Sequence, residues 1–405
     1  MSLIVQKFGG TSVKDISKIK RACLLISTEH KKGNQVVVIV SAMAGETTKL
    51  INLSKNFNYS KNLDEYDVIV STGEQVSVGL VSMCLNGMGI KAQSLLGWQI
   101  PIICDDNHSK AKIIEINTNS ILKILKNSAI PIIAGFQGIS YTEKKIVTLG
   151  RGGSDTSAVA IAASMSADRC DIYTDVDGVY TSDPKIVPKA KKIDRISYEE
   201  MLEFASLGAK VLQTRSVEMA MRYNVEVQVL SSASGQPGTL VVKEEKDMEK
   251  ALVSGITHSK EECNITLINL EDRPGIAAKI FTPLSDANIN VDMIVQTGSE
   301  SGNNINFTFT VSDSDLKLAV SLMNEHKNEI GFQRIITNDK LSKISIIGLG
   351  MRTHSGVAKK MFTTLASKNI NIHVISTSEI KISVLVNEEF TELAVKALHS
   401  VFELD

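Results

Sequence analysis

Several features that identify common protein classes are scarce in this 405-residue chain. The five cysteines are an odd number, lie far apart and show no Cys-x-x-Cys spacing, which argues against a disulfide framework and a zinc site. The net charge of −1 gives no general reason to expect nucleic acid or an anionic membrane as a partner. No apolar run approaches the roughly 20 residues of a membrane span, and the N-terminus does not resemble a secretory signal, so we expect a cytoplasmic protein.

Histidine is also rare where acid–base chemistry would need it. Only His30 and His108 precede His258, and neither belongs to a catalytic motif. Without a Ser-His-Asp or Cys-His set, the N-terminal part of the chain favours a reaction that depends on positioning and charge neutralisation, such as phosphoryl transfer. A carboxylate acceptor, with an ordinary pKa of about 4, is ionised at neutral pH and requires no general base.

The chain is long and apolar enough for two or three domains, with 43% hydrophobic and 22% charged residues. Residues 36–40 form a continuous apolar run, which is typical of a strand covered on both faces. Such short runs alternate with helical segments, and this alternation predicts βαβ units with a mainly parallel sheet. A charge-dense segment at residues 243–250 marks the expected boundary of this α/β domain.

The stretch at residues 146–157 combines an apolar strand, a glycine-rich turn and the start of a helix. We expect backbone N–H groups to be left unpaired at this turn, so that they form an anion cradle beside Arg151. The stretch is neither a dinucleotide-binding fingerprint nor a P-loop. A tight turn between a strand and a helix is the simpler alternative.

Other polar residues follow neighbouring strands. Lys7 precedes the Gly9-Gly10 turn, and residues 41–48 contribute three hydroxyl groups. Because open α/β sheets bind ligands outside the carboxyl ends of their strands, Lys7 is expected to meet a phosphate. Gly73 is expected to turn the chain and leave Glu74 at the start of a helix, where its charge suits the helix dipole, although simple helix capping explains Glu74 equally well.

A turn rich in aspartate follows residues 170–174. Asp175, Asp177 and Gly178 suggest a calcium loop at first sight, but the glycine comes too early and no closing glutamate follows. An exposed turn near a nucleotide or its metal is the better interpretation of these carboxylates.

The C-terminal part contains an internal repeat with an offset of 81 positions, as from Gly275 to Gly356. The first copy predicts a βαββαβ order over residues 264–337, whereas the second stops before its last strand. We expect residues 251–257 to supply that strand, so that the two copies are interleaved.

Five sequence blocks together resemble the signature blocks of aspartate kinases: Lys7–Ser12, Ser71–Glu74, Gly135–Gly138, Leu149–Thr156 and Tyr173–Pro184. This resemblance covers essentially the whole chain. It implies an α/β fold, the amino acid kinase αβα sandwich with a mainly parallel sheet, followed by two βαββαβ (ferredoxin-like) ACT repeats. It also implies ATP- and Mg²⁺-dependent phosphorylation of the β-carboxylate of L-aspartate, the first step toward lysine or diaminopimelate, threonine and methionine.

The resemblance further implies roles for individual residues. The phosphate-binding set is Lys7, Gly9, Gly10 and Ser12, with Lys7 and Asp155 as catalytic residues, and Asp155 supporting Lys7 or the pocket. The nucleotide side adds Thr174, Asp175, Tyr180, Asp183, Lys185 and Lys210. The aspartate pocket comprises Ser41, Thr47 (with Thr48 as an alternative), Glu74, Arg151 and Ser154. No protein metal ligands are implied.

ACT repeats imply amino-acid sensing, here of lysine, threonine or both, and a homo-oligomer formed through the repeats. The implied effector contacts are Asp272, Pro274, Gly275, Asn290, Asp292 and Gln296, then Met351, His354, Gly356, Val357, Asn371 and Glu379. A turn geometry alone also explains Pro274-Gly275. Met248 marks a possible internal start for a shorter chain.

The expected domains are residues 1–245, 264–340, and 251–258 together with 341–405. Two other functions remain open: a kinase for another acidic amino acid such as N-acetylglutamate, and a non-catalytic amino-acid sensor.

Overall fold

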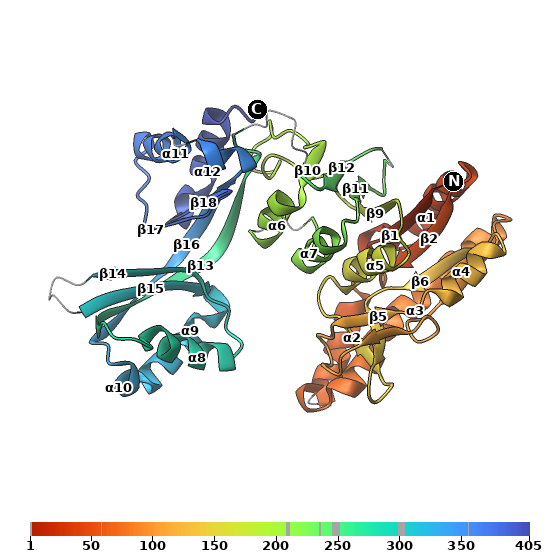
Figure 1. The fold of residues 1–405 in the computed structure, drawn as a ribbon, viewed down its shortest axis with the longest axis horizontal. Helices are drawn as coiled ribbons and strands as arrows, with labels where there is room; N and C mark the ends of the chain where they lie inside the picture. Colours follow the sequence, from red (N-terminus) through yellow and green to blue (C-terminus); the bar gives the residue numbers. More distant parts are fainter. Residues whose placement is uncertain are drawn as a thin grey trace. The chain divides into compact units, whose positions relative to one another are not determined.

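The computed structural model describes residues 2–57, 59–207, 211–234, 236–244, 252–298, 304–354 and 356–405. The chain forms two compact units, one of Met1–Val179 and Lys192–Met248, the other of Tyr180–Lys191 and Glu249–Asp405 (Figure 1). Two residues singled out in the sequence, Lys210 and Met248, lie outside the described residues.

An eight-stranded sheet forms the centre of the first unit. Its strands, in chain order, are β1 (Leu3–Phe8), β2 (Gln35–Val40), β3 (Ala92–Leu95), β6 (Ile130–Ala134), β9 (Arg169–Thr174), β10 (Arg195–Ser197), β11 (Val227–Ser231) and β12 (Thr239–Val242). Their order across the sheet is β10-β12-β11-β9-β1-β2-β6-β3. Every pair is parallel except β11 with β12, so the predicted mainly parallel sheet is confirmed.

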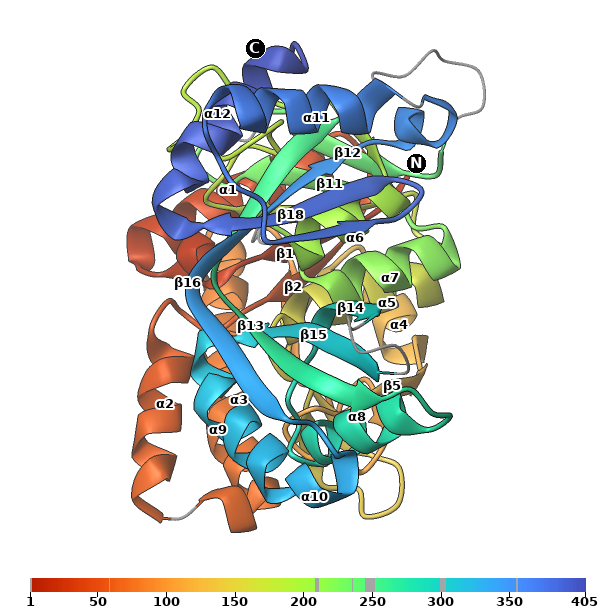
Figure 2. The same ribbon diagram turned by 90° about the vertical axis from the view of Figure 1, so that its left-hand side faces the viewer.

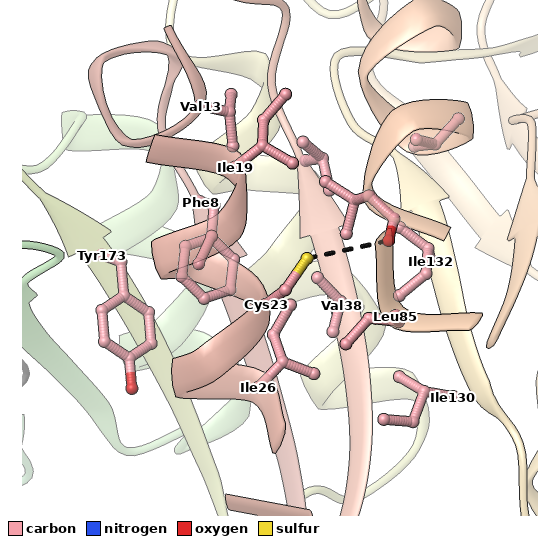
Figure 3. Packing of buried hydrophobic residues seen from close by; sticks show 14 of the residues in the cluster. Phe8, Val13, Ile19, Cys23, Ile26, Val38, Leu85, Ile130, Ile132 and Tyr173 are labelled. Carbon is pink, nitrogen blue, oxygen red and sulfur yellow. Dashed lines mark hydrogen bonds between the residues drawn. The ribbon is translucent and has the colours of Figure 1, made fainter. Parts of the chain in front are cut away.

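Helices cover both faces of this sheet. The first unit contains α1 (Ile16–Lys31), α2 (Glu46–Ser54), α3 (Leu63–Gly87), α4 (Asn119–Lys126), α5 (Gly153–Ser164), α6 (Tyr198–Ser206) and α7 (Thr214–Tyr223). Side chains of α1 and α3 form a core with β1, β2 and β6, shown in Figure 3, where the rings of Phe8 and Tyr173 stack with centroids 4.6 Å apart. On the other face of β1, Lys7 points toward α5, because successive side chains of a strand alternate.

A smaller sheet with the order β5-β4-β7-β8 also belongs to the first unit. Its strands are β4 (Ile102–Cys104), β5 (Ile113–Ile116), β7 (Gln137–Ser140) and β8 (Ile146–Thr148), and β8 leads directly into the glycine turn before α5. Helix α3 contacts β8 of this sheet and β3 and β6 of the larger sheet. Its length and hydropathy match those of a membrane span, which sequence inspection missed, but half of its most apolar window is buried in the protein, as in a core helix.

The second unit contains a six-stranded sheet with the order β14-β15-β13-β16-β18-β17. The strands are β13 (Gly255–Glu271), β14 (Asp292–Gly298), β15 (Asn304–Ser312), β16 (Arg334–Ile347), β17 (Val374–Thr377) and β18 (Lys381–Asn387). The helices are α8 (Ile276–Asp286), α9 (Asp313–Glu325), α10 (Lys327–Ile330), α11 (Gly356–Ser367) and α12 (Thr391–Val401).

Two long strands join the repeats. β13 and β16 pair antiparallel from Gly255 opposite Ile347 to Ile268 opposite Arg334, and Figure 2 shows them running through both halves of the sheet. The start of β13 therefore lies beside the first strand of the second copy. This pairing supplies the strand that the second copy lacks, and the repeats are interleaved.

The second unit also includes a segment from within the kinase part of the sequence, Tyr180–Lys191. Ile186 and Val187 pack in the core of the second repeat, and the Thr181 carbonyl accepts a hydrogen bond from the N–H of Ile256. The sequence predicted that residues 1–245 form one domain, whereas in the structure residues 180–191 belong to the second unit. The reason is that the apolar side chains of this segment pack in the core of the second repeat.

Candidate active site

The carboxyl ends of β1 and β9 meet at the point where the strand order of the first unit reverses. Beyond the end of β1, the Gly9 N–H donates to the carbonyl of Tyr173 over 3.1 Å, and the Ser12 hydroxyl donates to the same carbonyl over 3.3 Å. A Cβ on Gly10 would lie 2.8 Å from the carbonyl oxygen of Ala42, so only glycine lets these loops approach so closely. Such a reversal point is where open α/β sheets bind ligands.

A buried ion pair joins β1 to the first turn of α5. Lys7 Nζ lies 2.5 Å from Asp155 Oδ1, and the two side chains are 10% and 9% exposed. Taking both charges out of water is costly unless each compensates the other, so the pair fixes the position of the lysine ammonium group. This ion pair is the contact that a supporting role of Asp155 toward Lys7 requires.

Glu74 lies in the middle of α3, so the expected helix start at this residue is wrong. Gly73 continues the helix; a Cβ there would come within 2.8 Å of the Ala42 Cβ, so glycine serves close packing and not a turn. Glu74 Oε1 accepts the N–H of Ala42 over 3.0 Å, while Oε2 is buried and has no hydrogen-bond partner in the described part of the chain. Burial raises the pKa of Glu74 to about 7, and the backbone hydrogen bond only partly opposes this rise.

The glycine turn before α5 is not the open backbone cradle that the sequence suggests. Gly150 and Gly152 adopt left-handed φ values of 76° and 71°, which explains why glycine is required there. The N–H groups of Gly153, Asp155 and Thr156 donate to the carbonyls of Gly150 and Gly152. The expectation of unpaired N–H groups is wrong for these three, because the tight turn itself supplies their acceptors.

Most of the predicted substrate and phosphate residues line one cavity of about 690 Å³ in the first unit. Its lining includes Lys7, Gly10, Ser41, Thr47, Glu74, Arg151, Ser154 and Asp155. Thr48 is not among the lining residues, whereas Thr47 is. The cavity thus brings together a lysine, an arginine, two carboxylates and several hydroxyl groups, which suits a zwitterionic ligand next to a phosphate.

Several cavity residues were not anticipated from the sequence. Phe136 belongs to one of the recognised blocks, but it was given no role. Ser109 and Lys110 come from the loop between β4 and β5, Tyr66 from α3, and Gln213 precedes α7. Apart from Phe136, these residues follow no motif, and only the three-dimensional structure brings them to the cavity.

The residues assigned to the nucleotide side belong to both units. Thr174 ends β9, and its hydroxyl donates to Asp175 over 3.0 Å. Tyr180, Asp183 and Lys185 belong to the second unit, where Asp183 accepts the N–H of Lys185 over 2.9 Å. Within the described ranges, no group of three or more His, Cys, Asp or Glu side chains could hold a metal ion. Lys7 and the glycine turn that follows it suit phosphate groups. Bound Mg²⁺ would take its ligands from phosphate oxygens and water.

Among the predicted effector residues, Gly275 and Gly356 hold corresponding positions in the two repeats, each at the start of a helix. Gly275, with φ of 90°, precedes α8, and Gly356 begins α11. The remaining residues of the two sets are Asp272, Pro274, Asn290, Asp292 and Gln296 in or near β13 to β14, and Met351, His354, Val357, Asn371 and Glu379 between β16 and β18.

Asp292 already has a partner within the chain. Lys343 Nζ lies 2.7 Å from Asp292 and 3.1 Å from Glu262. Burial alone would raise the pKa of Asp292, but the hydrogen bond and charge of Lys343 outweigh this effect and lower it. An effector ammonium group at Asp292 would therefore compete with Lys343.

Comparisons with known proteins agree with this geometry. Residues 2–231 match the amino acid kinase family, and residues 265–326 and 344–402 match the ACT domain. An aspartate kinase from Pseudomonas putida is 49% identical over 100% of this chain and 98% of its own. The crystal structure of E. coli aspartokinase III with aspartate and ADP has a TM-score of 0.80 at 28% identity, covering 98% of this chain and 99% of that one.

The same E. coli enzyme in complex with lysine and aspartate has a TM-score of 0.78 at 28% identity, with the same coverage. The family matches together span both units, and the similarity extends over the full length of the chain. The chain therefore belongs to the aspartate kinases, members of the amino acid kinase family that carry ACT repeats.

Proposed function

We propose that the cavity of the first unit binds L-aspartate through Glu74 and Arg151. The observation that carries this proposal is that Glu74 lines the cavity and that its buried Oε2 atom has no hydrogen-bond partner among the described residues. A substrate ammonium group would satisfy it, and the planar guanidinium of Arg151 can hold a carboxylate in two places. The hydroxyl groups of Ser41, Thr47 and Ser154 would complete the pocket.

Lys7 and the turn at Gly9, Gly10 and Ser12 would hold the phosphates of ATP. An oxygen of the substrate β-carboxylate attacks the γ-phosphorus, the bond from this phosphorus to the β,γ-bridging oxygen breaks, and the products are 4-phospho-L-aspartate and ADP. Lys7 would neutralise charge on the transferred group, and Mg²⁺ supplies further charge neutralisation when bound. The attacking carboxylate is already ionised, so no side chain has to remove a proton.

The remaining nucleotide assignments rest on the sequence resemblance. We infer that Thr174 and Asp175, at the end of β9, contact the nucleotide, and that Tyr180, Asp183, Lys185 and Lys210 contribute to the same function. The crystal structure of E. coli aspartokinase III with aspartate and ADP supports a nucleotide and an amino acid bound together.

A hydroxamate assay with ATP, Mg²⁺ and aspartate tests the proposal, because hydroxylamine traps the acyl phosphate. Wild-type protein should form the product and Lys7→Ala should form almost none. Equal product from both would refute the role of Lys7. No product from wild type would favour a non-catalytic sensor, and preference for N-acetylglutamate in a competition assay would favour the other kinase.

We further propose that the ACT repeats bind an amino-acid effector and assemble the chain into a homo-oligomer in the cytoplasm. The lysine complex of E. coli aspartokinase III supports lysine as one candidate, with threonine as the other. The effector contacts predicted above, from Asp272 to Gln296 in or near β13 and β14 and from Met351 to Glu379 between β16 and β18, would bind it. Kinase activity that remains unchanged in millimolar lysine and threonine, added singly and together, would refute this regulation.

Native expression tests whether a shorter chain starts at Met248. A single protein band would argue against such a chain.

A further inference from the structure

A second buried carboxylate, Asp67, lies two helical turns before Glu74 on the same face of α3. The Asp67 side chain is fully buried, and it accepts three hydrogen bonds. Oδ2 accepts the Nδ1–H of His108 over 2.8 Å and the N–H of Ser109 over 3.0 Å, while Oδ1 accepts the Thr148 hydroxyl over 2.5 Å. An ionised carboxylate can only accept, so this arrangement uses the His108 tautomer with its proton on Nδ1.

The partners of Asp67 belong to two different walls of the cavity. His108 and Ser109 lie in the loop between β4 and β5, and Ser109 lines the cavity. Thr148 also lines it, and it ends β8 just before the turn that carries Arg151. Asp67 itself is not a lining residue, so it reaches the cavity only through these neighbours.

Other hydrogen bonds join the two walls to each other. The N–H of Ala111 donates to the carbonyl of Thr148 over 3.0 Å. The guanidinium of Arg215 donates to the carbonyls of Leu149 and Ala111, over 2.8 Å in each case. The two walls are therefore hydrogen-bonded to each other, and Asp67 attaches both of them to the helix that carries Glu74.

We propose that Asp67 is a positioning residue for the aspartate subsite. By fixing the loop and the end of β8 against α3, it sets the distance between Arg151 and Glu74, the two groups assigned to the substrate carboxylate and ammonium. This inference rests on the proposed function of those two residues. Because Lys7 and its glycine turn lie on other elements, loss of the attachment should weaken aspartate binding and leave ATP binding unchanged.

The test is steady-state kinetics of Asp67→Asn and His108→Ala, with the KM of each substrate measured separately. Loss of a hydrogen bond to a charged group predicts an increase of about tenfold in the KM for aspartate, with the KM for ATP unchanged. His108→Asn should restore much of the wild-type value, because an asparagine amide nitrogen can replace Nδ1. Asp64→Asn is the matched control, since Asp64 is on the same helix and pairs with Lys145, and neither of these two residues lines the cavity.

Several outcomes would overturn the proposal. One is an unchanged KM for aspartate in folded His108→Ala and Asp67→Asn. Another is a KM for ATP that rises as much as the KM for aspartate, because an equal rise indicates a general structural role. If Asp67→Asn does not fold, His108→Ala and Thr148→Val decide the question in the same way. Failure of the proposed function would be distinct, because wild-type protein would then not phosphorylate aspartate at all.

Discussion

Replacing Glu74 by glutamine should change how the stability of the first unit depends on pH. The Glu74 residue is 3% exposed, and burial raises its pKa from 4.5 to about 7. A carboxyl group whose pKa is higher in the folded protein stabilises folding most at low pH, and this contribution is lost as the pH rises from 4.5 through about 7. At about 1.4 kcal/mol per pH unit, the whole difference corresponds to about 3 kcal/mol.

Urea unfolding at several pH values between about 5 and 8, without aspartate, measures this effect in the transition of the unit that contains α3. Wild-type protein should lose about 2 to 3 kcal/mol of unfolding free energy relative to Glu74→Gln across this range. Glu65→Gln is the control, since Glu65 is exposed on the same helix and should behave as wild type. Identical pH dependence in wild type and Glu74→Gln would refute the argument from burial.

The same ionisation predicts how aspartate binding responds to pH. The substrate ammonium group needs the charged form of Glu74, so the KM for aspartate should fall as the pH rises toward about 7 and level off above it. Glu74→Gln should bind aspartate more weakly and lose this pH dependence. A wild-type KM that stays constant from pH 5 to pH 8 would contradict the pairing of Glu74 with the ammonium group.

Three further predictions concern other parts of the chain. Asp155→Ala leaves Lys7 buried without its partner and should destabilise the first unit by about 3 kcal/mol in urea unfolding, whereas an exposed pair would cost far less. Gly10→Ala should raise the KM for ATP several-fold, since the new Cβ would collide with the carbonyl of Ala42; an unchanged value would argue against the phosphate role of this turn. His399→Leu, which removes hydrogen bonds from a fully buried ring, should lower the thermal midpoint of the second unit by several degrees, and an unchanged midpoint would show that these bonds contribute little.

The sequence was most informative where a pattern is regular. The repeat at an offset of 81 positions, with one strand missing from its second copy, correctly predicted that a segment ahead of the first copy completes the sheet. The polar residues after β1 and β2 were correctly expected at one edge, because parallel strands end on the same side of a sheet.

Close packing explains where sequence reasoning failed. Glycine is usually a signal for a turn, but Gly73 lies within a helix, where its missing Cβ makes room for Ala42. Ala42 belongs to a loop distant in sequence, so no local pattern shows this packing. Nor does any local pattern distinguish Asp67 from a surface aspartate. Its importance depends on His108 and Thr148, which are 41 and 81 positions away along the chain.

The segment Tyr180–Lys191 has a consequence for how the chain can be divided. Its Thr181 hydroxyl bonds to the buried ring of His399 over 2.9 Å, and Ile186 and Val187 pack in the same core as Leu398 and other apolar residues. A fragment that begins at the charged linker would lack this segment and would expose that core to water. Such a fragment, expressed alone, would therefore have to cover the exposed apolar surface with another molecule or repack its core. Adding the peptide of residues 180–191 back to such a fragment should raise its stability.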